Sequence, residues 1–384
     1  MESPLNAPAE AVSVPPRWCH DCLAGVVEID CLPLVRRGAG EEEGMKVYFP
    51  LNPYNQQRQY EKPAWVYPAH LAMYATALHH QGNDIQWGGD AKGSYDHIVQ
   101  DDFAIDIPFD QLPYPDRILT DAKHPRWQSY GNYKRKPATH MMASNLCWYG
   151  KCTFCIDTWK LEHGEARGVR SVAHVMAEID DLIAQGYREV FDDSGTFPVG
   201  AWLEEFCRAM QSRKRHITIG CNMKPVTLNY QMMADAGFRF ILVGIESANQ
   251  ETVNRIKKGQ RSEDIIPIIK SMSDAGLEPH GTFMSAYPFE TFEEEKKTIK
   301  LCHYLLRKGY LKTAQVSVYS PPRTAPDPLS EGHKRIPLYF NVYKSPEFWY
   351  RKIVDTRSLD DIKYLFRGAR LVAEEYYRKL WKAR

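Results

Sequence analysis

Beyond about Thr139 the chain alternates strand-like and helix-like segments with a regularity that few folds can accommodate. Short apolar runs alternate with longer segments whose apolar residues recur at helical spacing. We place strands at residues 141–145, 189–192, 217–221, 238–245, 280–284 and 314–319. Such alternation indicates a parallel α/β sheet, either open and doubly wound or closed into a full or partial barrel. The pattern alone does not choose between these arrangements.

Three of the predicted helices have clear end signals. The segment 171–186 begins at a serine and stops at a glycine, and the segment 262–276 does the same. In the segment 291–309, Thr291 and Glu294 form a capping box and a glycine ends the helix. These signals support the strand–helix alternation.

The chain before residue 117 differs from this pattern. Residues 1–44 are rich in proline, alanine and short polar turns, which indicates a disordered leader or a reading frame that truly starts at Met45. Residues 45–116 contain one strand–helix–strand unit, with strands at 46–49 and 84–87, and end in a proline-rich linker. We therefore predict a barrel core at 117–325 and a helical C-terminal extension at 326–384.

Composition narrows the class of protein. The 384 residues are 43% hydrophobic and carry a formal charge of +1, as in a soluble globular protein with no bulk preference for nucleic acid. The longest apolar runs, such as residues 240–245, are too short to span a membrane. The first residues lack the pattern of a secretory signal. We therefore expect a cytoplasmic protein whose thiols stay reduced.

Three of the nine cysteines, Cys147, Cys152 and Cys155, lie within nine residues. This crowding favours a metal centre over a disulfide framework. Three thiolates can hold three corners of a cubic iron–sulfur cluster and leave the fourth iron open. A structural zinc site and reduced free thiols are the alternatives.

The other cysteines need no common explanation. Cys207 and Cys302 lie on apolar helical stripes and are expected to be buried. Cys221 ends a strand pattern and allows either interpretation. Cys19 and Cys22 form a C-x-x-C pair near Cys31, but no second pair follows, so a zinc site there is not expected.

Polar side chains follow several predicted strands directly. In parallel α/β folds the carboxyl ends of the strands meet at one rim, so these side chains are expected to lie close together. The polar candidates are Asp192, Asp193, Ser194, Asn222, Glu246 and Ser247, and the apolar Met284 ends a strand at the same rim. Together with the cysteine loop they predict a site for a cluster and a small polar cofactor.

Six motifs in order resemble the radical S-adenosylmethionine (SAM) superfamily, particularly enzymes with an N-terminal cobalamin-binding domain. They are the cysteine loop with Phe154 before its last cysteine, Asp192-Asp193, Gly244–Ser247, Lys258-Gly259, Gly281–Met284 and Tyr287–Glu290. The resemblance spans roughly residues 45 to 325. It implies a parallel (β/α)6 partial TIM barrel that carries a [4Fe–4S] cluster and binds SAM.

The chain departs from that family in two places. The family usually spaces its cysteines C-x3-C-x2-C, whereas four residues separate Cys147 from Cys152. The N-terminal unit has room for about two strands, and no Asp-x-His-x-x-Gly signature for cobalt ligation occurs. We therefore expect a truncated N-terminal domain that does not bind cobalamin.

The resemblance also implies roles for individual residues. The three cysteines ligate the cluster, and its unique iron takes the amino and carboxylate groups of SAM. Around SAM, Phe154 and Met284 contact the adenine, Asp192 and Asp193 the ammonium, Glu246 and Ser247 the ribose or methionine, and Arg255 the carboxylate. Ser194 and Asn222 complete the predicted set. Aspartates at strand ends also cap helices, and Arg255 suits a solvated helix equally well.

These inferences predict an enzyme that cleaves SAM reductively to a 5′-deoxyadenosyl radical, which abstracts hydrogen from an unidentified substrate. An electron donor such as a flavodoxin or ferredoxin is the implied partner. A cobalamin-dependent methyltransferase is the alternative enzyme. A non-catalytic protein with structural zinc is the alternative of another class.

Overall fold

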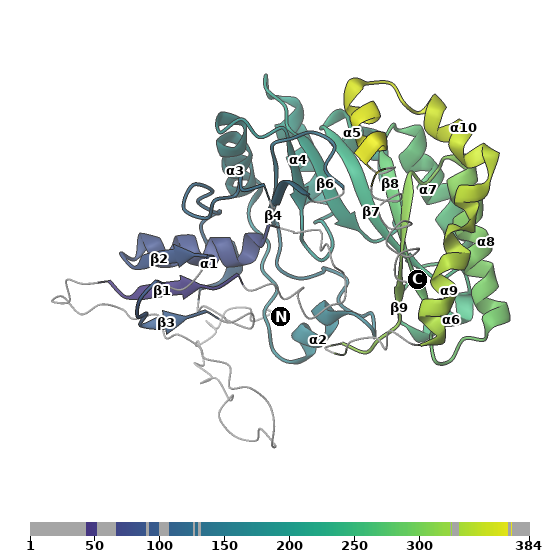
Figure 1. The fold of residues 1–384 in the computed structure, drawn as a ribbon, viewed down its shortest axis with the longest axis horizontal. Helices are drawn as coiled ribbons and strands as arrows, with labels where there is room; N and C mark the ends of the chain where they lie inside the picture. Colours follow the sequence, from purple (N-terminus) through teal and green to yellow (C-terminus); the bar gives the residue numbers. More distant parts are fainter. Residues whose placement is uncertain are drawn as a thin grey trace, which may run out of the picture.

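The computed structural model describes residues 44–51, 67–89, 92–99, 107–125, 127–129, 132–322, 324, 330–367 and 370. The predicted leader, apart from Gly44, and the Cys19–Cys22 pair lie outside the described residues. The described chain forms a three-stranded and a six-stranded sheet (Figure 1). None of its described helices combines the length and apolar character needed to cross a membrane.

The small sheet has the order β2-β1-β3, and both strand pairs are parallel. Its elements are β1 (Lys46–Phe49), α1 (Ala69–His80), β2 (Asp84–Trp87) and β3 (His97–Ile98). The first two strands lie where the sequence predicted them. The expectation of only about two strands was wrong, because β3 pairs with Val47 and Tyr48 of β1. A two-residue strand is too short to show periodicity.

The large sheet runs from β4 to β9 in sequence order, and every neighbouring pair is parallel. Its strands are β4 (Ala138–Met141), β5 (Glu189–Asp192), β6 (Thr218–Met223), β7 (Phe238–Glu246), β8 (Glu278–Ser285) and β9 (Thr313–Val318). Between the described strands, β4 and β9 do not pair. The parallel α/β partial-barrel prediction is therefore confirmed.

Helices connect these strands, as the alternation predicted. They are α2 (Ile156–Glu162), α3 (Val172–Ala184), α4 (Ala201–Gln211), α5 (Tyr230–Asp235), α6 (Gln250–Arg255), α7 (Ile265–Asp274) and α8 (Phe292–Lys308). The capping box at Thr291 is present, and Gly309 ends α8 in the left-handed conformation. No residue range was predicted for α2, α5 or α6, because segments of six or seven residues show little periodicity.

The first barrel strand lies earlier than predicted. We placed it at 141–145, but β4 ends at Met141. The Ala143 N–H donates to Asp192 Oδ2 at 2.7 Å, and the Ser144 N–H donates to Ser194 Oγ at 2.9 Å. Side chains at the end of β5 therefore bind this backbone in place of a strand ladder.

Helix α1 contacts both sheets. Leu71, Ala75 and Leu78 pack in the core of the small sheet, whereas Ala72 and Met73 belong to the core of the barrel. One helix thus joins the two hydrophobic cores. The division at residue 117 stays a prediction.

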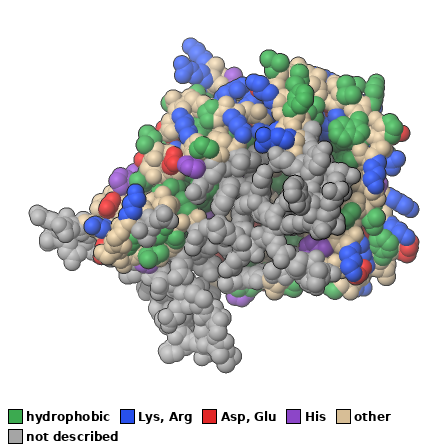
Figure 2. Space-filling model, viewed as in Figure 1, with side chains coloured by type: hydrophobic (Ala, Val, Ile, Leu, Met, Phe, Trp, Pro, Cys, Tyr) green, Lys and Arg blue, Asp and Glu red, His purple; other side chains and the backbone are tan. Residues whose placement is uncertain are grey.

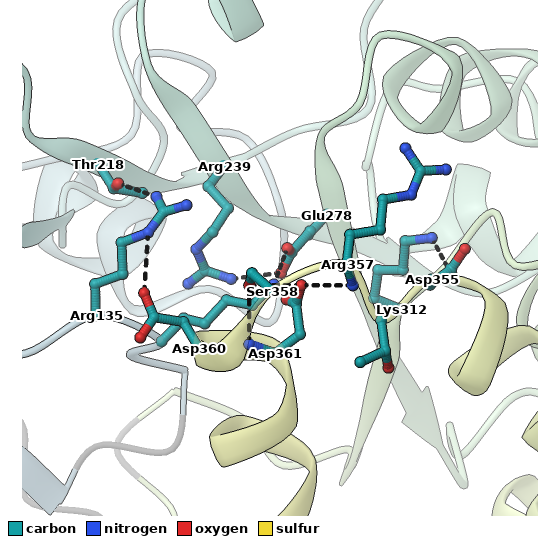
Figure 3. Close-up of polar contacts among 12 residues, drawn as sticks. Arg135, Thr218, Arg239, Glu278, Lys312, Asp355, Arg357, Ser358, Asp360 and Asp361 are labelled. Atoms are coloured by element: carbon teal, nitrogen blue, oxygen red, sulfur yellow. Dashed lines mark hydrogen bonds and ion pairs between the residues drawn. The ribbon is translucent and has the colours of Figure 1, made fainter.

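The N-terminal end of the barrel is closed by ion pairs (Figure 3). Arg239 pairs with Glu189 and with Glu278, at 2.5 Å in the latter case, and Arg135 pairs with Asp360 at 3.8 Å. Asp360 belongs to a helical segment, 359–367, of the C-terminal extension. The extension also contains α9 (Glu331–Tyr339), a 3-10 helix (Phe340–Lys344) and α10 (Pro346–Val354), so its predicted helical character is confirmed over the described residues.

Candidate active site at the C-terminal ends of the strands

The cysteine loop follows β4 and leads into α2. Cys152 is buried, and Cys147 and Cys155 are half-buried. The Cys147 N–H donates to Asp157 Oδ2 at 2.8 Å, and the Thr153 N–H donates to the Ile256 carbonyl at 3.1 Å. Burial raises the pKa of the Cys152 thiol to about 11 and also raises that of Cys155. The loop is thus held by α2 on one side and by the end of α6 on the other.

The chain turns at Gly150, within the four-residue spacing between Cys147 and Cys152. This glycine has φ +53°, and a Cβ there would lie 2.5 Å from Leu161 Cδ1. The turn places Tyr149 across Gly259, where a Cβ would lie 2.0 Å from the tyrosine hydroxyl oxygen. That hydroxyl donates to the Lys257 carbonyl at 2.9 Å. We call the contact of Tyr149 with Lys257 and Gly259 the loop latch.

Two buried lysines flank the loop. Lys258 Nζ lies 3.0 Å from Glu246 Oε1 and 5.7 Å from the Phe154 ring centroid. Lys224 Nζ donates to the Gly259 carbonyl at 2.7 Å and lies 4.6 Å from the Tyr149 ring centroid. Burial opposes the charge of Lys258, but Glu246 and Cys152 more than offset it and raise the pKa. Burial and the nearby Lys258 lower the pKa of Lys224.

Neither lysine was predicted to be a site residue. Lys258 belongs to the Lys258-Gly259 motif, and Lys224 directly follows the strand that ends at Met223. Across the described ranges, no carboxylate forms an ion pair with Lys224. A buried ammonium group without a carboxylate is costly unless another negative charge lies near it. The cysteine loop is the neighbouring feature that can supply one.

Asp192 and Ser194 brace the loop. Asp192 is fully buried, and its carboxylate accepts the Ala143 N–H and the Ser194 N–H. Burial raises its pKa to about 7, although hydrogen bonds from Ser194 and Ala143 oppose the rise. Ser194 Oγ accepts the Ser144 N–H. Both side chains therefore already accept hydrogen bonds from the backbone that precedes the cysteine loop.

Asp193 and Asn222 lie side by side at the ends of β5 and β6. Asn222 Nδ2 donates to the Ser194 carbonyl at 3.0 Å, and the Asn222 side chain also hydrogen-bonds Asp193. Protein surrounds Asp193 and raises its pKa to about 6, although solvent still reaches the side chain. Asp193 is thus more open to a ligand than Asp192.

The end of β7 is strained at Glu246. This residue has φ +65°, and the ladder between β7 and β8 shifts register between Gly244 and Glu246. Non-glycine residues adopt such a φ mainly where the surroundings enforce it, often at functional sites. The next residue, Ser247, donates its hydroxyl to Glu290 Oε1 at 3.1 Å. The strand end therefore aims Glu246 at Lys258 while Ser247 holds Glu290.

Two predicted residues are placed differently from the rest. Arg255 is exposed, pairs with Glu251 at 2.9 Å and lies 5.4 Å from the Phe289 ring centroid. Met284 is half-buried on β8. Among the described residues, Tyr287 Oη and Glu290 Oε2 are buried and have no hydrogen-bond partner. Buried polar groups are normally satisfied, so these atoms mark positions where a ligand group would be expected.

The donor set fits an iron–sulfur cluster. Three thiols lie on one loop, and the two buried ammonium groups lie near it. A cluster held by three thiolates carries net negative charge, which these lysines would offset. In the described part of the chain, no three Cys, His, Asp or Glu side chains form a group that could hold one metal ion.

One family model matches the middle of the chain. Residues 141–302, about two fifths of the sequence, match the model of the Radical SAM superfamily. This segment is therefore similar to radical SAM domains.

Individual relatives match only in part. An uncharacterized methyltransferase of Pyrococcus horikoshii is 27% identical over 187 residues, which cover 47% of this chain and 39% of the relative. Among solved structures, the cobalamin-dependent SAM radical enzyme OxsB with aqua-cobalamin has a TM-score of 0.43 and 17% identity, covering 73% of this chain and 39% of its own. The chain thus spans about two fifths of the length of these proteins.

A second solved structure is the radical SAM methyltransferase TsrM from Kitasatospora setae with cobalamin and a [4Fe–4S] cluster bound. It has a TM-score of 0.40 and 20% identity, covering 48% of this chain and 35% of its own. Both of these solved structures contain cobalamin. The expectation that this chain does not bind cobalamin stays a prediction.

Proposed function

We propose that this protein is a radical SAM enzyme in which Cys147, Cys152 and Cys155 ligate a [4Fe–4S] cluster. The observation that carries the proposal is the pair of buried lysines beside the cysteine loop, Lys224 and Lys258, of which only Lys258 has a described carboxylate partner. Bound thiolates would provide the missing negative charge. The matched radical SAM domain supports the same assignment.

When bound, the cluster and SAM supply one electron and a sulfonium bond whose cleavage gives methionine and a 5′-deoxyadenosyl radical, which takes hydrogen from substrate. Asp193 is the proposed acceptor for the SAM ammonium, because its carboxylate remains accessible while Asn222 orients it. Such a bond to an ionised group is stronger than a neutral one. Asp192 and Ser194 hold the loop backbone that precedes the cysteines.

The remaining residues are assigned around the same rim. Phe154, with Lys258 over its ring, and Met284 would line the adenine site. Glu246 is proposed to contact the ribose or methionine, and its strained backbone holds it at the strand end. Ser247 would act through Glu290. Arg255 would have to leave Glu251 to reach a SAM carboxylate.

Reconstitution tests the proposal. The protein is loaded anaerobically with iron and sulfide, reduced with dithionite, and supplied with SAM. Cys152→Ala should lose the brown colour, about one cluster's content of iron and all formation of 5′-deoxyadenosine. Cys302→Ala, a buried cysteine of α8 outside the loop, should keep all of these.

Two outcomes would contradict the proposal. One is an unaltered protein that forms no 5′-deoxyadenosine and shows no cluster absorbance. The other is bound zinc that is lost on Cys152→Ala while iron never binds, which would establish the structural zinc alternative.

A cobalamin-dependent methyltransferase is the second candidate. It is favoured by the Pyrococcus horikoshii relative, which is named as a methyltransferase. The described N-terminal unit has a parallel sheet of three strands with one helix, which is smaller than the five-stranded unit expected of a cobalamin domain. Corrin absorbance retained on protein purified from cobalamin-supplied cells, with methyl transfer from SAM, would select this candidate.

We also propose that the protein is cytoplasmic and that a flavodoxin or ferredoxin is its electron donor. A reducing compartment keeps the three loop thiols available for iron. The substrate is an organic molecule or biopolymer yet to be identified.

A further inference from the structure

The loop latch leaves two lysine side chains exposed beside the proposed cluster ligands. Lys151 directly precedes Cys152, and Lys257 accepts the Tyr149 hydroxyl at its carbonyl while its side chain stays exposed. Lys151 Nζ lies 5.9 Å from the Tyr149 ring centroid. Within the described ranges neither lysine forms an ion pair with a carboxylate. Their charges are therefore available to a partner.

Two acidic groups on neighbouring segments are paired with other cations, whereas Glu162 at the end of α2 is exposed. Glu251 pairs with Arg255 at 2.9 Å, and Glu165 pairs with Lys160 at 3.4 Å. Asp157 is half-buried and accepts the Cys147 N–H. The latch also ties the backbone of Lys257 to the loop, because the Tyr149 hydroxyl donates to the Lys257 carbonyl at 2.9 Å. A positively charged rim is thus attached directly to the loop that carries the cysteines.

We infer that Lys151 and Lys257 form the docking surface for a small acidic electron-transfer protein. This inference rests on the proposed function, because it requires a cluster at Cys147, Cys152 and Cys155. A partner seated on residues 148–151 is separated from the cluster position only by the ligand loop. One electron then passes from the reduced partner to the cluster, and no proton or chemical group is transferred.

Charges at the edge of such an interface act mainly on association. They steer an oppositely charged partner, increase the association rate at low salt and make binding weaken as salt increases. Neutralising both lysines should therefore weaken binding and flatten its salt dependence. The chemistry inside the barrel is not altered by this change.

A second basic surface provides the matched control. Lys214, Arg215 and His216 are exposed in the loop before β6, at the opposite, N-terminal end of the strands. Lys and Arg side chains also gather near the upper edge of the face shown in Figure 2. A hollow of about 400 Å³ lies beside His216, but the arginines that line it, Arg135 and Arg239, already pair with carboxylates. This end is remote from the cysteine loop.

The experiment compares two double variants of the reconstituted full chain, Lys151→Gln with Lys257→Gln, and Lys214→Gln with Arg215→Gln. A flavodoxin hydroquinone and a reduced [2Fe–2S] ferredoxin serve as probes. Binding constants and the rate of probe oxidation are measured at low and high salt. The rim variant should bind roughly ten-fold more weakly at low salt and lose most of its salt dependence, and the control should change less than about two-fold.

Dithionite, which needs no docking surface, is used in parallel as the reductant. Unchanged binding by the rim variant, a larger loss in the control variant, or no binding of either probe to the unaltered chain would overturn the docking surface. In each case SAM cleavage with dithionite would leave the proposed function standing. Absence of SAM cleavage with dithionite in the unaltered protein would contradict the proposed function itself.

Discussion

Gly259 is required in the loop latch for two reasons, its backbone conformation and its close contact with Tyr149. Its φ is +60°, and the Tyr149 hydroxyl passes where a Cβ would stand. An L-amino acid in the left-handed region costs roughly 1–2 kcal/mol by itself. At Gly259 the clash with Tyr149 adds to that cost. The cysteine loop thus depends on a glycine in another segment of the chain.

Alanine substitutions at two glycines separate these effects. Gly276 has φ +83° and nothing within 4 Å of its Cβ position, so Gly276→Ala should lower the unfolding free energy by about 1 kcal/mol and leave iron binding unchanged. Gly259→Ala should cost more and lower the iron content after reconstitution, because Tyr149 must move. Urea unfolding and iron analysis measure both. Equal effects at the two positions would show that the latch does not support the loop.

At the scale of elements, the end of β5 organises the segment that follows β4. Asp192 receives two backbone N–H groups, one from Ala143 and one from Ser194. This arrangement replaces ladder bonds beyond Met141 and directs the chain toward the cysteines. The carboxyl is nevertheless fully buried, so its charge is unfavourable there.

Asp192 should therefore make stability depend on pH. Its pKa is about 7 in the folded protein and 3.8 when accessible, so the folded state holds the proton to higher pH. This contribution to the unfolding free energy is complete below about pH 4 and is lost as the pH rises to about 7, by roughly 4 kcal/mol at most. Asp192→Asn should remove that slope in urea unfolding measured between these pH values. If the unfolding free energy of the variant depended on pH as before, groups other than Asp192 would cause that dependence.

At the scale of the whole molecule, a buried charge cluster joins the segment before the barrel to the barrel wall. Glu178 of α3 pairs with Arg117 and Arg170 at 2.5 Å each, and all three side chains are buried. Arg117 also donates to the His140 carbonyl and Arg170 to the Met142 carbonyl. Both backbone partners flank the end of β4. The cluster therefore fixes the chain on either side of that strand.

Removing the Glu178 carboxylate should destabilise the fold strongly. Glu178→Gln leaves two buried guanidinium groups without their counter-charge and should lower the unfolding free energy by about 3–5 kcal/mol. Asp180→Asn, two residues further along α3, removes an exposed partner of Arg213 and should cost less than about 1 kcal/mol. Urea unfolding of both variants gives the comparison. If both variants lost similar unfolding free energy, burial would not explain how much the Glu178 cluster contributes to stability.

Local patterns predicted most elements well, because periodicity and capping act over neighbouring residues. The strands at 46–49, 84–87 and 189–192 lie as predicted, and the capping box at Thr291 begins its helix. The short helices α2, α5 and α6 were missed because they are too short to show periodicity. The first barrel strand was placed too late because hydrogen bonds to Asp192 and Ser194 hold the segment after Met141. In the site, Lys224 was missed because its meaning depends on Tyr149, which is distant in sequence.

The sequence by itself determined the parallel strand–helix architecture and the crowding of three cysteines after the first barrel strand. Both are local, since hydrophobic spacing and residue identity can be read within a few positions. The tertiary structure alone decided how the longer loop is accommodated and which charges surround it. Tyr149, Lys224, Lys258 and Gly259 meet only when separate strand ends converge on one rim, so burial and charge pairing there depend on contacts that no single segment contains.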